Sequence, residues 1–335
     1  MTNPEADMGK HTVQKTWWFG LHPKWHIAVI LTLVAAVAIA TGAFIFRSQT
    51  TSAGATLANP FATNSPFNTT IAGNAQIDPA SQAMIARATR DGRVYASTLE
   101  FGIPIYGADR RTPRYTVNCT ITYWGPCPFA GKQVPIPNGA RPHSGSDGAM
   151  VVVDQGDNKI YEFWQARNSG GKWTASFGAV NPLNGSGWGG ASTGSGASRL
   201  GGVVRIAEIE RGSIQHALVV QSDNICARIF RSPAIKTDGN STRADCLPEG
   251  ARLRLDPTLN LNTLQLTPGE RTVARALQQY GAYVIDIGGS PLSMSFELDT
   301  RAPAGSIGQV YERAGFRWDY DGMSAIPWKR LQVIR

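Results

Sequence analysis

The feature that most constrains this chain is an uncharged apolar run, IAVILTLVAAVAIATGAFIF, at residues 27–46. As a helix rising ~1.5 Å per residue, a run of this length matches a membrane hydrocarbon core of ~30 Å. The apolar core of a typical signal peptide is shorter, about 7–15 residues. The run therefore predicts one transmembrane helix that is retained as a signal anchor.

The positive charges around this run predict its orientation. Lys10, Lys15 and Lys24 precede it, whereas Arg47 is the only cation in the twenty residues that follow. Short segments rich in Lys and Arg stay on the cytoplasmic side of a membrane. Residues 1–26 are therefore predicted to be a cytoplasmic tail, and we expect a single-pass protein of the cell membrane with its C-terminal domain outside the cytoplasm.

The alternative for the N-terminus is a cleaved signal peptide, because the small residues Ala-Gly-Ala at 53–55 resemble a cleavage site. The apolar run is long, however, and this site lies well beyond its end, which favours the anchor. Residues 47–66 are small and polar with two prolines, and they are predicted to be a linker. Residues 67–335 then form one extracytoplasmic domain.

The composition of that domain predicts its fold class. About 270 residues can bury a sizeable core, and the chain's 36 glycines and 20 prolines favour strands and turns over helices. Residues 149–155, AMVVVDQ, and 159–167, KIYEFWQAR, are the clearest strands. We expect a mainly β domain, a single β-sandwich of jelly-roll type with a few short helices. One of those helices is predicted to begin at the capping box formed by Thr267 and Glu270.

The charge of the chain limits its partners. The net charge is +8, but no basic cluster stands out, so nucleic-acid binding is not predicted. A mildly basic exterior suits an anionic wall polymer or a membrane surface, and scattered surface arginines are the simpler interpretation. The expected partners are the membrane, through residues 27–46, and a polysaccharide; the sequence identifies no protein partner.

Four cysteines in a domain outside the cytoplasm predict disulfide bonds. The pairs Cys119–Cys127 and Cys226–Cys246 are favoured among the three possible pairings because each closes a short local loop. A zinc site is the alternative, but the chain contains no CxxC and no HxxxH motif. Only two of the five histidines lie beyond residue 26, which argues against a histidine-rich metal centre. We expect no metal and no cofactor.

Residues 185–202, GSGWGGASTGSGASRLGG, contain eight glycines. A GxGxxG pattern begins at Gly185, but the strand before it and the helix after it that a dinucleotide site requires are both missing. A mobile loop that presents Trp188 to a ligand is the better interpretation. A weak calcium loop involving Asn181, Asn184 and Ser186 is an alternative, although it lacks carboxylates.

Alternation along three predicted strands places carboxylates opposite apolar faces. Glu162, Asp286 and Glu297 lie in residues 159–165, 283–287 and 293–298, respectively, and neighbouring side chains on a strand point to opposite faces. If these strands share one sheet, the three carboxylates share its polar surface. Trp164 would lie on the same face as Glu162, as a stacking platform for a sugar ring.

Paired carboxylates suit glycoside hydrolysis, in which one protonates the leaving oxygen and the other attacks or activates water. We therefore predict a glycoside hydrolase or lyase acting on an envelope or environmental polysaccharide. Its expected catalytic residues are Glu162, Asp286 and His216, and its expected substrate contacts are Trp164, Trp188 and Glu297.

Three alternatives remain open for these residues. Half-exposed strands ordinarily carry polar residues that face water, and His216 suits a hydrogen-bonded structural role. A non-catalytic glycan-binding or envelope-interaction module would instead use Trp164 and Trp188.

Several motifs in series also resemble a known family. They are NPFATNSPFNTTIAGNAQIDPASQAMI, SDGAMVVVDQGDNKIYEFWQAR, GSIQHAL and LQQYGAYVIDIGG, and the resemblance spans residues 59–335. The family consists of secreted or membrane-anchored proteins of actinobacteria and other high-GC bacteria. It implies an exported single domain of β-sandwich type, and it supplies no activity and no catalytic residue.

Overall fold

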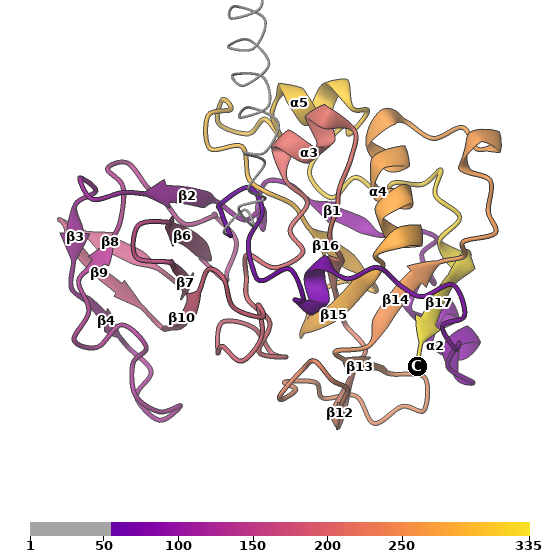
Figure 1. Ribbon diagram of the computed structural model, residues 1–335, viewed down its shortest axis with the longest axis horizontal. Helices are drawn as coiled ribbons and strands as arrows, with labels where there is room; N and C mark the ends of the chain where they lie inside the picture. Colours follow the sequence, from indigo (N-terminus) through magenta and orange to yellow (C-terminus); the bar gives the residue numbers. More distant parts are fainter. Residues whose placement is uncertain (1–54) are drawn as a thin grey trace, which may run out of the picture. The chain divides into compact units, whose positions relative to one another are not determined.

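The computed structural model describes residues 55–335, which form one compact unit (Figure 1). The predicted cytoplasmic tail, the predicted anchor and part of the predicted linker lie outside the described residues. Within residues 55–335, no helix is both long and apolar enough to cross a membrane. The last part of the predicted linker packs on the domain, since Phe61 is buried and stacks on Phe67.

The largest sheet has six strands in the order β1-β16-β11-β15-β14-β17. Its members are β1 (Tyr95–Ser97), β16 (Ser293–Ser295), β11 (Leu218–Ser222), β15 (Ala282–Ile287), β14 (Arg252–Leu255) and β17 (Leu331–Ile334). The pairs β1–β16 and β11–β15 are parallel, and the other three pairs are antiparallel. It is therefore a mixed sheet.

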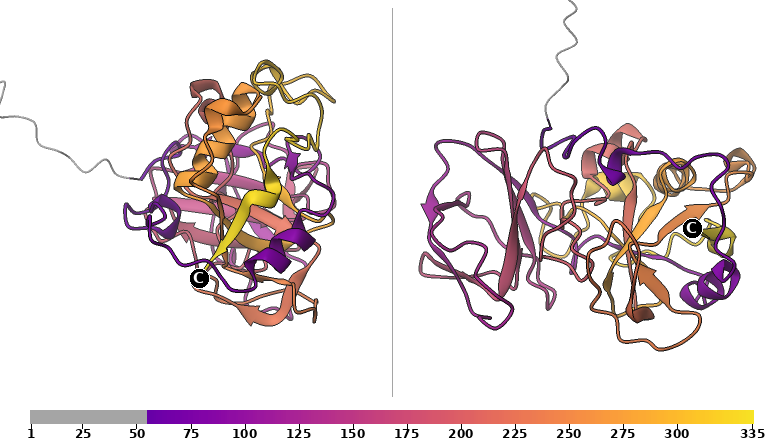
Figure 2. Two further views of the ribbon diagram at one scale, coloured as in Figure 1. Left: turned by 90° about the vertical axis from the view of Figure 1, so that its right-hand side faces the viewer. Right: turned by 60° about the horizontal axis from the view of Figure 1, so that its bottom comes forward.

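A four-stranded sheet lies beside the first one, in the order β10-β7-β6-β2 (Figures 1 and 2). It contains β2 (Ile105–Ala108), β6 (Met150–Asp154), β7 (Lys159–Trp164) and β10 (Phe177–Pro182). Three small ladders complete the β structure. They consist of β4 (Val117–Cys119), β9 (Lys172–Ala175) and β8 (Arg167–Ser169); β3 (Arg114–Tyr115) and β5 (Val134–Pro135); and β12 (Ile225–Phe230) and β13 (Leu247–Glu249).

The helices are few and short. They are α2 (Ser81–Ala88), α3 (Ile206–Arg211), α4 (Pro268–Gln279) and α5 (Gln309–Arg313), with 3-10 turns η1 (Pro66–Asn68), η2 (Leu261–Thr263) and η3 (Trp328–Arg330). The predicted capping box of α4 is confirmed: Glu270 N donates to Thr267 Oγ1 at 3.2 Å, and Thr267 N donates to Glu270 Oε2 at 2.9 Å. The apolar side of α4 then packs on β14.

Three apolar clusters form the core. The largest joins the six-stranded sheet to α2 and α4, and a second lies between the two sheets, where Val151 and Val153 share a cluster with Val219 and Ile285. The third covers the other face of the four-stranded sheet, around Phe163. A mainly β fold is thus confirmed. The jelly-roll sandwich is not, because that fold is antiparallel, whereas the larger sheet contains parallel pairs.

Both predicted disulfides are confirmed, Cys119–Cys127 and Cys226–Cys246. Replacing Cys226 and Cys246 by serine should lower the free energy of unfolding by about 2–4 kcal/mol, because this bridge constrains the unfolded chain. It joins cysteines 20 residues apart, whereas the other bridge joins cysteines 8 residues apart. Replacing Cys119 and Cys127 by serine should therefore lower the free energy of unfolding by a smaller amount, as measured by denaturant unfolding. The opposite ranking would contradict this account.

Candidate functional site

A cavity of about 730 Å³ opens between the six-stranded sheet and the loop that precedes β6. Tyr95 from β1, Gln221 from β11 and Asp286 from β15 line its sheet side. His143 and Asp147 line it from the loop before β6, and Arg199 lines it from the glycine-rich loop. The cavity therefore collects polar side chains from segments that are far apart in the sequence.

A β-bulge positions Asp286. Val220 pairs with Val284, but the next residue of β11, Gln221, pairs with Asp286, so Ile285 is one extra residue in β15. Bulges of this kind re-aim side chains and are common beside active sites. The side chain of Asp286 is 16% exposed, so the carboxyl group is deeply set and still reaches the cavity.

Arg199 lies between two carboxylates of the cavity. Its Nη1 is 3.9 Å from Asp147 Oδ2, and its Nη2 is 3.8 Å from Asp286 Oδ2. Its backbone N–H donates to Glu162 Oε2 at 3.0 Å, and Nη2 also donates to the carbonyl oxygen of Ser192. Arg199 is thus held both at its backbone and at its guanidinium group, and the guanidinium group lies within 4 Å of Asp147 and of Asp286.

Two nitrogen atoms at this cavity are buried without a hydrogen-bond partner among the residues described. They are Arg199 Nε and His143 Nδ1. Burial, with a smaller contribution from the Arg199 charge, lowers the pKa of His143 to about 4, so its ring is uncharged at neutral pH. Buried polar groups in proteins are nearly always hydrogen-bonded. Both atoms are also covered by other protein atoms, so a ligand in the cavity would reach them only after side chains move.

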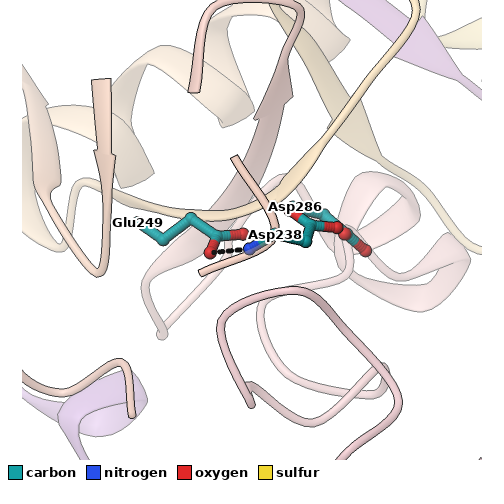
Figure 3. A group of neighbouring side chains, drawn as sticks. All are labelled: Asp238, Glu249 and Asp286. Carbon is teal, nitrogen blue, oxygen red and sulfur yellow. Dashed lines mark hydrogen bonds between the residues drawn. The ribbon is translucent and has the colours of Figure 1, made fainter. Parts of the chain in front are cut away.

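Asp286 also belongs to a cluster of three carboxylates, with Asp238 and Glu249 (Figure 3). One oxygen from each of Asp238, Glu249 and Asp286 lies within 4.8 Å of the others. Gly194 N–H donates to Asp286 Oδ1 at 3.1 Å, and Asp238 N–H donates to Glu249 Oε2 at 3.3 Å. A Cβ on Gly194 would lie 2.6 Å from Glu249 Oε1, so a larger residue here would displace the carboxylates of the cluster.

Burial and mutual repulsion favour protons in this cluster. Burial raises the pKa of Asp286 well above its ordinary value, and contact with Asp238 raises it further. Burial, followed by the Asp238 charge, raises the pKa of Glu249 to about 8. Like charges at such distances disfavour simultaneous ionisation. Glu249 is therefore expected to hold a proton at neutral pH, and the same causes favour the protonated form of Asp286.

The same carboxylates are the only group within residues 55–335 whose spacing could hold a metal ion. Ca²⁺ takes about six to eight oxygen ligands, so three carboxylates would form a site only together with waters or backbone carbonyls. Protons need no further ligands, and burial together with the nearby Asp238 carboxylate raises the pKa of Asp286. We therefore assign protons to the cluster.

This assignment predicts a pH dependence of stability. With a folded pKa of about 8 against an ordinary value of 4.5, Glu249 binds more protons in the folded state between these values. Its contribution is complete below the ordinary value and is lost as the pH rises through about 8, with a slope of at most ~1.4 kcal/mol per pH unit. The free energy of unfolding, measured across this pH range for wild type and for Glu249→Gln, should decline less steeply with pH in the variant. Equal slopes would contradict the assignment.

The alternation would place Glu162 and Asp286 on the polar surface of one shared sheet. In the structure the two residues lie in different sheets. Glu162 lies on β7 of the four-stranded sheet and is fully buried. Its carboxylate accepts hydrogen bonds from the hydroxyls of Ser192 and Ser198 and from the backbone N–H of Arg199. It does not line the cavity. Glu162 therefore holds the glycine-rich loop, and through it Arg199, in place.

His216 and Glu297 also lie away from the cavity. Burial lowers the pKa of His216, but the hydrogen bond and the charge of Glu208 raise it. The net shift of this pKa is upward. Its Nε2 is 3.2 Å from Glu208 Oε2. Glu297 accepts from Arg205 Nε at 2.9 Å and from Ile206 N–H at 3.0 Å, at the start of α3. These contacts are those of residues that anchor α3 to the sheet.

The two predicted tryptophans have different surroundings. Trp188 stacks on Phe67 and packs edge-on against Tyr283, each with ring centroids 5.4 Å apart, and therefore belongs to the core between the sheets. Trp164, in contrast, donates from Nε1 to Asp147 Oδ1 at 3.1 Å. Of the six predicted site residues, Asp286 lines the cavity and Trp164 contacts its wall.

Sequence reasoning missed His143, Asp147, Arg199, Asp238 and Glu249. Two of them carry a local signal. Arg199 is the only charged residue in residues 185–202, and Asp147 ends a Gly-Ser-Asp turn just before the strongest predicted strand. A single charge in a glycine-rich loop must find a partner or water, which marks it as a candidate. The other three residues show no such signal.

Comparison of the chain with family models, curated proteins and solved structures finds no match in any of the three. The resemblance to exported actinobacterial proteins therefore stays a prediction. The function must be argued from the geometry of the cavity.

Proposed function

We propose that this protein is a glycoside hydrolase in which Asp286 is the general acid and Asp147 is the second carboxylate. The observation that carries the proposal is their placement on either side of Arg199, at one cavity. Both carboxyl groups lie within 4 Å of one guanidinium group, which brings them to the same part of the cavity, as the acid pair of a glycosidase requires. Asp147 thus takes the place that the sequence predicted for Glu162.

The environments of the two carboxyl groups suit different roles. Asp286 is deeply set, and burial raises its pKa, which favours the protonated form that a leaving oxygen needs. The side chain of Asp147 is 41% exposed, and it accepts a hydrogen bond from Trp164. This leaves Asp147 able to attack the sugar or to activate water, and the separation of the pair in a complex would decide between the two.

The other residues of the cavity can hold a sugar. Sugar hydroxyls both donate and accept, so they can hydrogen-bond to polar side chains that line the cavity, among them Asp147, Arg199 and Gln221. A volume of about 730 Å³ is within the range of small-molecule sites, ~300–1,000 Å³. With the predicted anchor, the enzyme would act at the outer face of the cell membrane on an envelope or environmental polysaccharide.

A two-stage experiment tests this proposal. The full-length protein in detergent is first screened against an array of microbial and plant polysaccharides. The bound polysaccharides are then incubated with the enzyme, and new reducing ends are counted. We expect turnover of at least one bound polysaccharide. Tight binding with no new reducing ends from any of them would instead assign a glycan-binding module.

A further inference from the structure

Two neighbouring aromatic side chains are exposed in the loop that follows β4. Tyr123 is 80% exposed and Trp124 is 53% exposed. Large aromatic side chains bury more surface than most residues when they pack. Tyr123 and Trp124, which stay largely exposed to water, do not gain the full stabilisation of such burial. Their position suggests that a ligand covers them.

This loop is held rigidly. The disulfide Cys119–Cys127 closes it at its base. The Trp124 ring stacks on Trp164 with centroids 5.4 Å apart and planes at 23°, and Phe177 meets Trp124 edge-on at 5.7 Å. Tyr123 packs edge-on against Trp124 at 6.0 Å. A fixed aromatic surface binds with little loss of conformational entropy.

The aromatic stack is continuous with the cavity. Trp164 lies under Trp124, and its Nε1 donates to Asp147 Oδ1 at 3.1 Å. Asp147 in turn lines the cavity and faces Arg199. A chain that leaves the cavity past Asp147 would therefore run along the outer surface of this stack.

We infer that Trp124 and Tyr123 form a sugar-binding subsite for a polysaccharide chain that extends out of the cavity. The inference rests on the proposed function and specifies its substrate as a polymer longer than the cavity holds. The apolar face of a pyranose ring, with its hydroxyl groups at the rim, matches an aromatic ring bordered by polar groups.

Other occupants fit this surface less well. Residues 119–127, CTITYWGPC, contain no Lys or Arg, so the loop offers no attraction to anionic lipids. Two side chains are also far fewer than the 20–30 residues that each side of a standard protein interface contributes. Continuity with the cavity favours the glycan.

The test measures binding without turnover, in the Asp286→Asn background of the full-length protein. Calorimetry with gluco-, galacto- and arabino-oligosaccharide series, from disaccharides upward, gives affinity against chain length. Trp124→Ala should weaken the binding of the longer oligosaccharides of the bound series by roughly three- to tenfold. The affinity for the shortest oligosaccharide should be unchanged. Phe230→Ala is the matched control, since Phe230 is 44% exposed and does not line the cavity.

The outcomes separate this inference from the proposed function. Equal loss at every chain length, no loss at any length, or no length-dependent binding of any series would overturn the subsite. Trp124→Phe should keep most of the affinity, and unchanged thermal unfolding of both variants would show that the loop is intact. If the length-dependent loss appears but wild type cleaves none of the bound sugars, the subsite stands and the hydrolase proposal fails.

Discussion

Replacement of Asp286 by Asn is expected to lower the turnover number by about 10²–10⁴-fold and to leave glycan binding largely intact. The amide still accepts the hydrogen bond from Gly194 N–H, so the local backbone is retained. It has no proton to give to a leaving oxygen at neutral pH. Asp147→Asn should lower turnover on the same scale, because an amide neither attacks the sugar nor activates water.

The control for both variants is Asp91→Asn. Asp91 lines the same cavity, where its carboxylate accepts from the Tyr95 hydroxyl at 3.3 Å, but no ion pair joins it to Arg199. Its replacement should change turnover only a few-fold. Steady-state kinetics on the polysaccharide found by the array would measure all three. An Asp286→Asn enzyme with near-wild-type turnover would remove Asp286 from the mechanism.

Replacement of Glu162 by Ala is expected to act on stability. It removes the acceptor of two buried hydroxyls and of the Arg199 backbone N–H, all of which stay away from water. Leaving buried donors unpaired costs about 1–3 kcal/mol each, so the free energy of unfolding should fall by about 3 kcal/mol or more. Chemical denaturation would measure the loss.

Glu162→Gln separates a structural role from a catalytic one. The amide keeps one acceptor oxygen, so this variant should be more stable than Glu162→Ala. Because Glu162 positions Arg199, the activity of the Glu162→Gln variant should fall together with its stability. Both should recover when bound glycan stabilises the glycine-rich loop. Complete loss of turnover in a variant that unfolds like wild type would contradict this view and restore a catalytic role for Glu162.

Local rules predicted the local features well. Short cysteine spacings identified both disulfides, and the Thr267–Glu270 box identified the start of α4, because each depends on residues close in the sequence. The alternation rule failed at Glu162 for a physical reason. β7 lies between β6 and β10, and both of its faces are covered, so Tyr161, Glu162 and Phe163 are all buried. The rule assumes that one face is wet.

The candidate site was predicted only in part, because it assembles across long sequence separations. Asp286 was found because it is the one charged residue in an otherwise apolar strand. Asp147 and Arg199 lie in loops, where no periodicity reports which way a side chain points. His216 and Glu297 looked available in the sequence, but Glu208 and Arg205 satisfy them in the fold. Such pairings depend on tertiary contacts.

The central claim is that Asp147 and Asp286 flank a glycosidic bond in this cavity. The most direct measurement is a crystal structure of the Asp286→Asn protein with an oligosaccharide of the bound series. The account predicts a sugar ring in the cavity, with residue 286 nearest the glycosidic oxygen, Asp147 beside the anomeric carbon and the Arg199 side chain in contact with the sugar. An oligosaccharide ordered elsewhere on the protein, with the cavity free of sugar, would contradict it.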